Sequence, residues 1–281
     1  EIPSILSWLF LRTAKLSAPF LFESIDWSPE QMKTFVEEPD RLKRLHAEYV
    51  IQQLAEMADQ VGPAAKLILG SYNLFVTKDE EAAAKWYRKG SDEGNARSQY
   101  TLGWCYSQGR GVKADWGQAF KWYTEGAKNG DCVSQFNLGI LSENPKEGGK
   151  KDLNEAIKWY REAAAQGHDE AMMAIGVCYL YGNGVSVDKV EAVKWFRKSA
   201  ELGNADGSFA LGYCLELGDG VEKDITQAVK YYRLAAAKGS SRAMLCLAEV
   251  LCKRGGPGIK EDNREAAMWF ERAFEAGYAP G

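Results

Sequence analysis

Side chains suited to catalysis are few in this chain of 281 residues, which contains two histidines and six cysteines. A cysteine or serine nucleophile needs a base beside it, and histidine usually supplies that base. His46 falls in a helical pattern near the N-terminus and His168 falls in a turn, and neither is tied to a thiol by its spacing. The sequence therefore predicts no catalytic residue and a protein that is not an enzyme.

Metal and phosphate sites are not indicated by the residue spacings either. Cys246 and Cys252 lack the short ligand spacing and the nearby histidine of a zinc site. G-x-G pairs begin at Gly109, Gly182 and Gly218, but each follows a helical pattern instead of a strand and lacks the third glycine of a dinucleotide-binding loop. We interpret these pairs as turns and predict no metal and no cofactor.

The elements around these residues are set by one segment that occurs six times. Its clearest copy is DWGQAFKWYTEGAKNG, from Asp115 to Gly130. The aromatic residue that follows the usual lysine returns every 36 to 38 residues, at Trp86, Trp122, Trp159, Trp195, Tyr231 and Trp269. A period in this range is typical of a stacked array of small units.

Each unit is predicted to hold two helices. Every copy of the segment opens with Asp and ends at Gly, which are the usual residues at a helix start and just after a helix end. The first half of each unit carries a second helical pattern with a Leu-Gly or Ile-Gly pair. Glycine inside a helix costs about 1 kcal/mol, so its return in phase predicts the close approach of a partner helix. These glycines are Gly70, Gly103, Gly139, Gly176 and Gly212, and Ala248 takes their place in the last unit.

The full pattern, A-x-x-x-L-G-x-x-Y-x-x-G-x-G-V-x-x-D-x-x-x-A-x-x-W-Y-x-x-A-A-x-x-G, resembles the Sel-one-like repeat family, relatives of the tetratricopeptide repeats, over about residues 64 to 278. The resemblance implies an all-α, right-handed superhelical solenoid of antiparallel helix pairs. It also implies an adaptor that holds other proteins together. We divide the chain into residues 1–62, an apolar arm with capping helices, and residues 63–281, six helix-pair repeats.

A partner-binding groove is predicted if the first helix of each unit lines the concave side, as in the related repeats. Positions just after the Leu-Gly pair and one turn later would then face the groove, and apolar side chains dominate them in the middle units. The predicted groove residues are Trp104, Gln108, Ile140, Val177, Tyr181, Tyr213 and Leu217. The alternative is that these side chains pack between neighbouring units.

Residues 1–22 are strongly apolar but are broken by Arg12, Lys15 and Pro19, and they are too short for a membrane-spanning helix. We expect an arm that packs on a partner or lies at a membrane surface; the alternative is that it folds back on the array. Its anchor residues are Ile5, Leu6, Trp8, Leu9, Phe10, Phe20 and Phe22. The last helix also lacks a polar cap, so we expect the array to belong to a larger complex or to continue.

A basic ridge is predicted on the second helices, at Lys121, Lys158, Arg161, Lys194, Arg197, Lys230 and Arg233. Such a ridge could bind anionic lipid or RNA, but a solvated outer face that suits the helix dipole is the favoured interpretation. The net charge of −4 and the pI of about 5.5 also argue against nucleic acid as a partner.

Cysteine usage indicates an intracellular, reducing compartment. Cys105, Cys178 and Cys214 share one phase of the repeat, at spacings too long for disulfides between neighbouring units, so we expect free thiols. Because the chain begins at Glu1, an organellar location after removal of a targeting peptide is also considered. Some cysteine-rich members of the family are credited with hydrolytic activity, and their paired cysteines are missing here. We therefore predict a non-catalytic scaffold.

Overall fold

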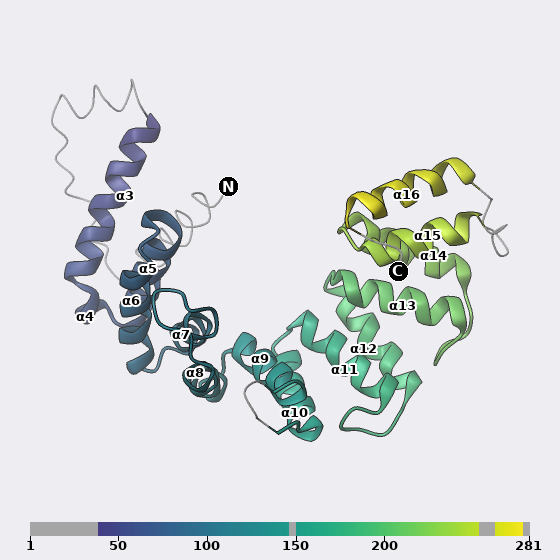
Figure 1. Ribbon diagram of the computed structural model, residues 1–281, viewed down its shortest axis with the longest axis horizontal. Helices are drawn as coiled ribbons and strands as arrows, with labels where there is room; N and C mark the ends of the chain where they lie inside the picture. The colour runs from purple at the N-terminus through teal and green to yellow at the C-terminus, as the bar shows by residue number, and fades with distance from the viewer. Residues whose placement is uncertain (1–38, 146–149, 253–261, 278–281) are drawn as a thin grey trace. The chain divides into compact units, whose positions relative to one another are not determined.

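The computed structural model describes residues 39–145, 150–252 and 262–277, and side chains from residue 48 onward (Figure 1). These ranges contain fourteen α-helices and one π-helical turn, and no strand is found within them. Contacts divide the chain into two compact units, residues 1–114 and residues 115–281. The predicted arm, residues 1–22, lies outside the described part.

The N-terminal unit contains the helices α3 (Pro39–Glu56), α4 (Ala58–Val61), α5 (Pro63–Tyr72), α6 (Glu80–Asp92) and α7 (Ala96–Gln108), and the π-helical turn η2 (Asn73–Thr77). The sequence predicts one helix over residues 39–61, but the structure breaks it at Met57, whose backbone leaves the helical region. Helix α5 packs against both α3 and α4, and α6 packs against α5 and α7. The segment predicted to cap the array therefore forms two helices, and both pack on α5.

A buried lysine joins the capping helices to the first repeat. Lys66 of α5 is fully buried and its ammonium lies 3.0 Å from Asp59 Oδ1 of α4, and it also pairs with Glu93 after α6. Burial lowers the pKa of Lys66, but the hydrogen bonds to Glu93 and Asp59 outweigh burial and raise it. In α7, Gln99 occupies the equivalent position and donates to the Ser91 carbonyl oxygen at 3.1 Å. The first repeat thus uses an ion pair where the next repeat uses an amide.

The C-terminal unit is a row of paired helices. Its helices are α8 (Trp116–Lys128), α9 (Cys132–Glu143), α10 (Leu153–Ala165), α11 (Asp169–Tyr181), α12 (Lys189–Glu201), α13 (Ala205–Leu217), α14 (Ile225–Ala237), α15 (Ser241–Cys252) and α16 (Asn263–Glu275). Each helix packs against the next one along the chain, most extensively within the pairs α9–α10, α11–α12, α13–α14 and α15–α16. This arrangement is the all-α solenoid of helix pairs that the sequence predicts.

The aspartates that open the second helices act as predicted. Each accepts a hydrogen bond from the backbone amide three residues later; the six are Asp79, Asp115, Asp152, Asp188, Asp224 and Asp262. The first helices are capped as well, by Asn95, Asp131, His168 and Asn204, which the sequence analysis did not identify. In these four pairs both helices therefore begin at a capping side chain, whereas α5 begins at Gly62 without one.

The close approach predicted at the mid-helix glycines is confirmed at four of the five. A Cβ added to Gly139 would lie 2.3 Å from Cε1 of Tyr160, which is closer than any real contact. The same fit joins Gly70 to Tyr87, Gly176 to Phe196 and Gly212 to Tyr232. In each of these four pairs one aromatic ring thus lies directly on the backbone of the facing helix.

The G-x-G pairs are turns, as predicted. In the loop after α11, Gly184 has a φ of +72°, and a Cβ there would lie 2.2 Å from the carbonyl oxygen of Leu153 in the preceding repeat. Gly220 meets Lys189 in the same way. The second glycine of each pair therefore lets one repeat rest on the backbone of the one before it.

Candidate functional site

Four of the predicted groove residues, Val177 and Tyr181 on α11 and Tyr213 and Leu217 on α13, form what we call the α11–α13 strip. The two helices pack on each other. Tyr181, Tyr213 and Leu217 are 70%, 47% and 51% exposed, whereas Val177 is half-buried against the core. Large apolar side chains are thus exposed on adjacent helices.

Helix geometry explains why these positions are exposed. Tyr213 and Leu217 are four residues apart, so both lie on one face of α13, and Val177 and Tyr181 are related in the same way on α11. The opposite face of α13 is buried through Leu211. The strip is therefore an apolar face of helices whose other side already forms the core.

Tyr213 rests on an aromatic base that the sequence analysis did not identify. The ring of Phe209 is stacked with that of Tyr213 at 6.2 Å between centroids, and it also contacts the buried Tyr232 at 5.9 Å. Arg242 of α15 lies 5.5 Å from the Phe209 ring and 3.7 Å from Asp206. Phe209 precedes Tyr213 by four residues, and this spacing was a signal that could have found it.

The other predicted groove residues are not all part of this strip. Ile140 is exposed on α9. Trp104 and Gln108 belong to α7 of the N-terminal unit, where Arg110 lies 5.8 Å above the half-buried Trp104 ring and Gln108 donates to Ser107 at 3.2 Å. Within the C-terminal unit, the residues brought together on packed helices are those of α11 and α13.

The predicted basic ridge is exposed, but several of its residues have partners. Lys121 lies 5.3 Å from the ring of Trp122. Further pairs are Lys158 with Glu155 at 3.5 Å, Lys194 with Glu191 at 2.8 Å, Arg161 with the Tyr179 hydroxyl at 2.9 Å and Arg233 with Glu265 at 2.8 Å. The hydrogen bond to Glu191 also raises the pKa of Lys194. Partnered cations attract a further anion less strongly than a bare row would.

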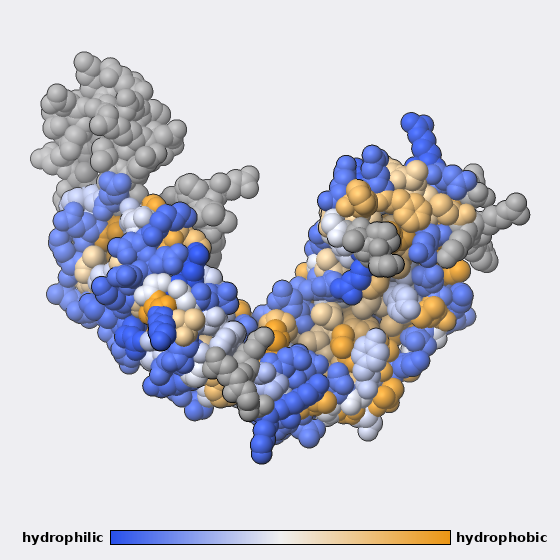
Figure 2. Space-filling model, viewed as in Figure 1, coloured by the Kyte–Doolittle hydropathy of each residue, from blue (hydrophilic) through white to orange (hydrophobic). Residues whose placement is uncertain are grey.

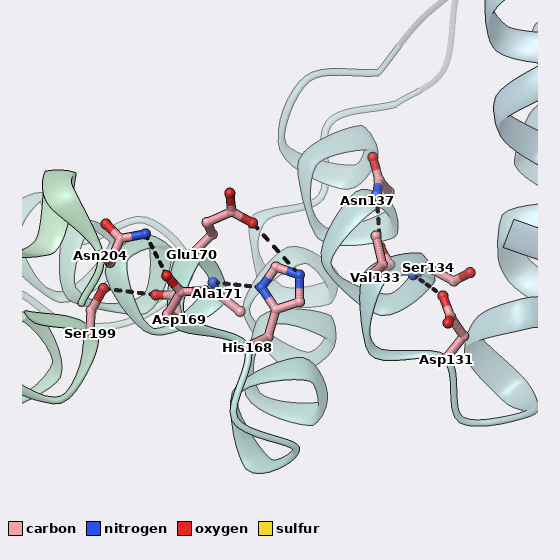
Figure 3. A network of polar contacts seen from close by, with 10 residues as sticks. All are labelled: Asp131, Val133, Ser134, Asn137, His168, Asp169, Glu170, Ala171, Ser199 and Asn204. Carbon is pink, nitrogen blue, oxygen red and sulfur yellow. Dashed lines mark hydrogen bonds and ion pairs between the residues drawn. The ribbon is translucent and has the colours of Figure 1, made fainter. Parts of the chain in front are cut away.

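A polar network around His168 fixes the start of α11 (Figure 3). His168 Nδ1 accepts from the Ala171 amide at 3.4 Å, and its ring is stacked on Phe136 at 4.7 Å. The side chains of His168, Asp169 and Glu170 lie within 4.8 Å of one another, the arrangement of a loose metal-ligand trio.

Asp169 also has structural partners on α12 and at the start of α13. Asp169 accepts from Asn204 Nδ2 at 3.0 Å, and its carbonyl oxygen accepts from Ser199 Oγ at 2.8 Å. Figure 3 shows the side chains of Ser199 and Asn204 both directed at Asp169. We therefore interpret the trio as a helix cap and a join between repeats.

The in-phase cysteines are poor nucleophiles. Burial raises the pKa of the Cys105 thiol to about 12, and it raises the pKa values of Cys178 and Cys214 to about 11. Because the thiolate is the reactive form, these thiols are inert near neutral pH.

A cleft of about 840 Å³ lies beside the start of α14. Its lining includes Arg197 and Tyr231 together with the turn residues Glu222, Lys223 and Asp224. Charges of both signs meet there, so the cleft indicates no particular ligand.

A second exposed apolar surface lies at the end of the described chain. Figure 2 shows hydrophobic residues gathered over α15 and α16. Met268, Phe270 and Phe274 of α16 are exposed. Among the described residues, no helix combines the length and apolar character needed to cross a membrane.

Comparison with known proteins gives one family. The model of the Sel1 repeat matches six consecutive segments, residues 63–95, 96–131, 132–168, 169–204, 205–240 and 241–278. No curated protein matches the chain.

Two solved structures are similar over most of the chain. One is c5321, a protective antigen present in uropathogenic Escherichia coli strains that displays an SLR fold, with 34% identity, a TM-score of 0.74, and coverage of 81% of this chain and 49% of that one. The other is a Sel1 repeat protein from Oxalobacter formigenes, with 31% identity, a TM-score of 0.72, and coverage of 80% and 99%. The chain thus spans about half the length of the E. coli antigen.

Proposed function

Because the chain belongs to the Sel1 repeat family, we propose that it is a non-catalytic scaffold that binds a segment of a partner protein on the α11–α13 strip. Sel1 repeat proteins generally mediate protein–protein interactions and are generally not enzymes. The proposal for this chain goes further, because it names the surface and the residues.

The observation that carries the proposal is the exposure of Tyr181, Tyr213 and Leu217 on adjacent helices. Aromatic side chains held on a rigid base bury a large area with little loss of conformational entropy when a partner binds. The stacking of Phe209 beneath Tyr213 supplies such a base.

The test is affinity purification of the full chain under mild conditions, with mass spectrometry of the bound proteins. We compare the double variant Tyr181→Ala, Tyr213→Ala with a control that removes Phe120 and Leu234, which are comparably exposed on the second helices. We expect the strip variant to lose its partners and the control to keep them. Equal retention by both variants would show that the strip is not the binding surface.

We also propose that residues 1–22 anchor the chain within a larger assembly in a reducing compartment. Their apolar sequence and the six cysteines, none of them bridged in the structure, support this. A variant lacking residues 1–22 is expected to lose a subset of the partners. If it instead keeps every partner but no longer floats with lipid vesicles, the arm binds a membrane surface.

The alternative functions have less support. A hydrolase of the cysteine-rich type would need a reactive nucleophile, and burial raises the pKa values of the three in-phase thiols. Binding of RNA or anionic lipid by the basic ridge would first have to displace partners such as Glu191 and Glu265. Such binding would weaken steeply with added salt, and a salt titration measures this.

A further inference from the structure

We propose that the partner segment is amphipathic and basic, with apolar side chains for the α11–α13 strip and lysine or arginine side chains for the carboxylates beside it. This inference rests on the proposed binding function and adds the chemistry of the partner.

The two layers of the C-terminal unit differ in charge. On the first helices, α9, α11, α13 and α15, six of the seven charged residues are acidic: Glu143, Asp169, Glu170, Asp206, Glu216 and Glu249, with Arg242 as the exception. On the second helices, α8, α10, α12, α14 and α16, twelve of the twenty charged residues are basic. The strip therefore lies in the acidic layer of a chain whose opposite layer is mainly basic.

The acidic residues share a helix face with the strip. Glu170 precedes Val177 by seven residues, and Asp206 precedes Tyr213 by the same number, so each pair lies on one face two turns apart. Glu170 and Asp206 are both exposed. Each helix thus presents a carboxylate at one end of an apolar line that ends at Tyr181 or Leu217.

A third carboxylate lies in line with the strip on the next first helix. Glu249 of α15 is exposed and occupies the repeat position of Tyr213 and Val177. Acidic residues at a helix start are stabilised by the helix dipole, which accounts for Glu170 without any ligand. Glu249 is in the last turn of α15, where the helix dipole does not favour a negative charge.

Arg242, the one basic residue on these four helices, leaves the layer acidic. Arg242 lies 3.7 Å from Asp206 and over the ring of Phe209, so its positive charge is paired with a carboxylate of the same surface. Glu170 has its nearest described charge partner in His168, at 3.7 Å. A lysine or arginine arriving with an apolar segment would meet carboxylates on one side and the faces of Tyr181 and Tyr213 on the other, and both attract cations.

The experiment uses the full chain and two synthetic amphipathic helices as probes. The two peptides share one apolar face of leucine and phenylalanine and carry either lysine or glutamate on the other face. Binding is measured by fluorescence anisotropy at low and high salt. We expect the lysine peptide to bind about tenfold more tightly at low salt, because two or three exposed ion pairs together contribute on that order.

A matched pair of variants tests whether the carboxylates of the acidic layer attract the lysine peptide. Glu170→Lys with Glu249→Lys changes two carboxylates of the acidic layer, and Glu162→Lys with Glu201→Lys makes the same change on exposed positions of α10 and α12. We expect the first variant to remove the preference for the lysine peptide and the second to keep it.

The possible outcomes separate this inference from the function on which it rests. If both peptides bind equally and Tyr213→Ala abolishes both, the strip is a binding surface but its partner need not be basic, and the inference fails alone. If neither peptide binds, and the chain instead forms a dimer that Tyr213→Ala disrupts, the strip is covered by a second copy and both proposals fail.

Discussion

At the scale of single residues, the mid-helix glycines Gly70, Gly139, Gly176 and Gly212 decide how closely the helices of their pairs can pack. We expect Gly139→Ala to destabilise the protein by about 1–3 kcal/mol, because the new methyl group would overlap Tyr160. Gly117→Ala is the control, since that exposed helical glycine faces only Asp115 Oδ1 at 3.3 Å and should be neutral or slightly stabilising. Urea unfolding measures both, and equal stabilities would contradict the close packing.

The aromatic ring that lies on each glycine also needs a suitable partner for its far end. The Tyr232 hydroxyl donates to Glu216 at 2.6 Å, and Tyr160 donates to Glu143 in the same way. In the repeat between them the ring is Phe196, and the position equivalent to Glu216 holds Leu180. In these three repeats, tyrosine at the ring position thus occurs with glutamate, and phenylalanine occurs with leucine.

This pairing predicts a compensated double variant. Tyr232→Phe should cost about 1 kcal/mol, because Glu216 loses a buried hydrogen bond. Adding Glu216→Leu should recover most of that loss, since it recreates the pair found at Phe196. The free energy of unfolding in urea checks both steps, and a double variant less stable than Tyr232→Phe would show that the two positions are not a unit.

The buried thiols predict a dependence of stability on pH. Burial raises the pKa of Cys178 to about 11, from an ordinary value near 9. Because this pKa is higher in the folded state, the contribution of the Cys178 thiol to stability is intact below pH 9 and is lost as the pH rises from 9 towards 11. Between these values only the unfolded chain releases the thiol proton. We therefore expect the midpoint of urea unfolding to fall above pH 9, and Cys178→Ser to flatten this fall.

Native alkylation at pH 8 is the complementary measurement on the thiols. The exposed Cys252 should react quickly, whereas Cys105, Cys178 and Cys214 should be protected until the protein unfolds. All six thiols should react after denaturation without a reductant. A smaller number would reveal disulfides and would favour the hydrolase alternative.

At the scale of helices, Asn204 shows how a cap also joins two repeats. Its Oδ1 accepts from the Gly207 amide at 2.8 Å, and its Nδ2 donates to Asp169 of the preceding repeat at 3.0 Å. Asn204→Ser should keep the cap and lose the join, whereas Asn204→Ala should lose both and cost about 1 kcal/mol more. Thermal unfolding compares them, with Asn154→Ala on the exposed side of α10 as the control. Equal losses in both Asn204 variants would mean that the cap contributes nothing.

The sequence predicted those features of the elements that depend on local chemistry. Residue type and spacing predicted that Asp188 caps a helix and that Gly139 lies at a close contact between two helices. Both predictions were confirmed. Contacts between residues far apart in the sequence were not predicted, such as the pairing of Lys66 with Glu93, which lies 27 positions away. For the candidate site, repeat register named Tyr181 and Tyr213, and the four-residue spacing on α13 could have added Phe209. The contact of Arg242 with Phe209 could not be predicted, because it depends on how α13 and α15 are arranged.

At the scale of the whole molecule, the contacts form two groups that should open independently. Gly70 fits against Tyr87 in the first unit as Gly139 fits against Tyr160 in the second, so alanine at either glycine is the same perturbation at two places. We expect Gly139→Ala to raise amide hydrogen exchange about tenfold within residues 115–281 and to leave residues 39–114 unchanged.

Gly70→Ala should produce the reciprocal pattern, with faster exchange confined to the first unit. Because stability in repeat proteins is approximately a sum of unit and neighbour terms, a local loss need not spread along the chain. Hydrogen-exchange mass spectrometry of both variants measures this directly. If either substitution accelerates exchange equally in both ranges, the chain opens as one body, and a partner bound at Tyr213 would then stabilise the first unit as strongly as the second.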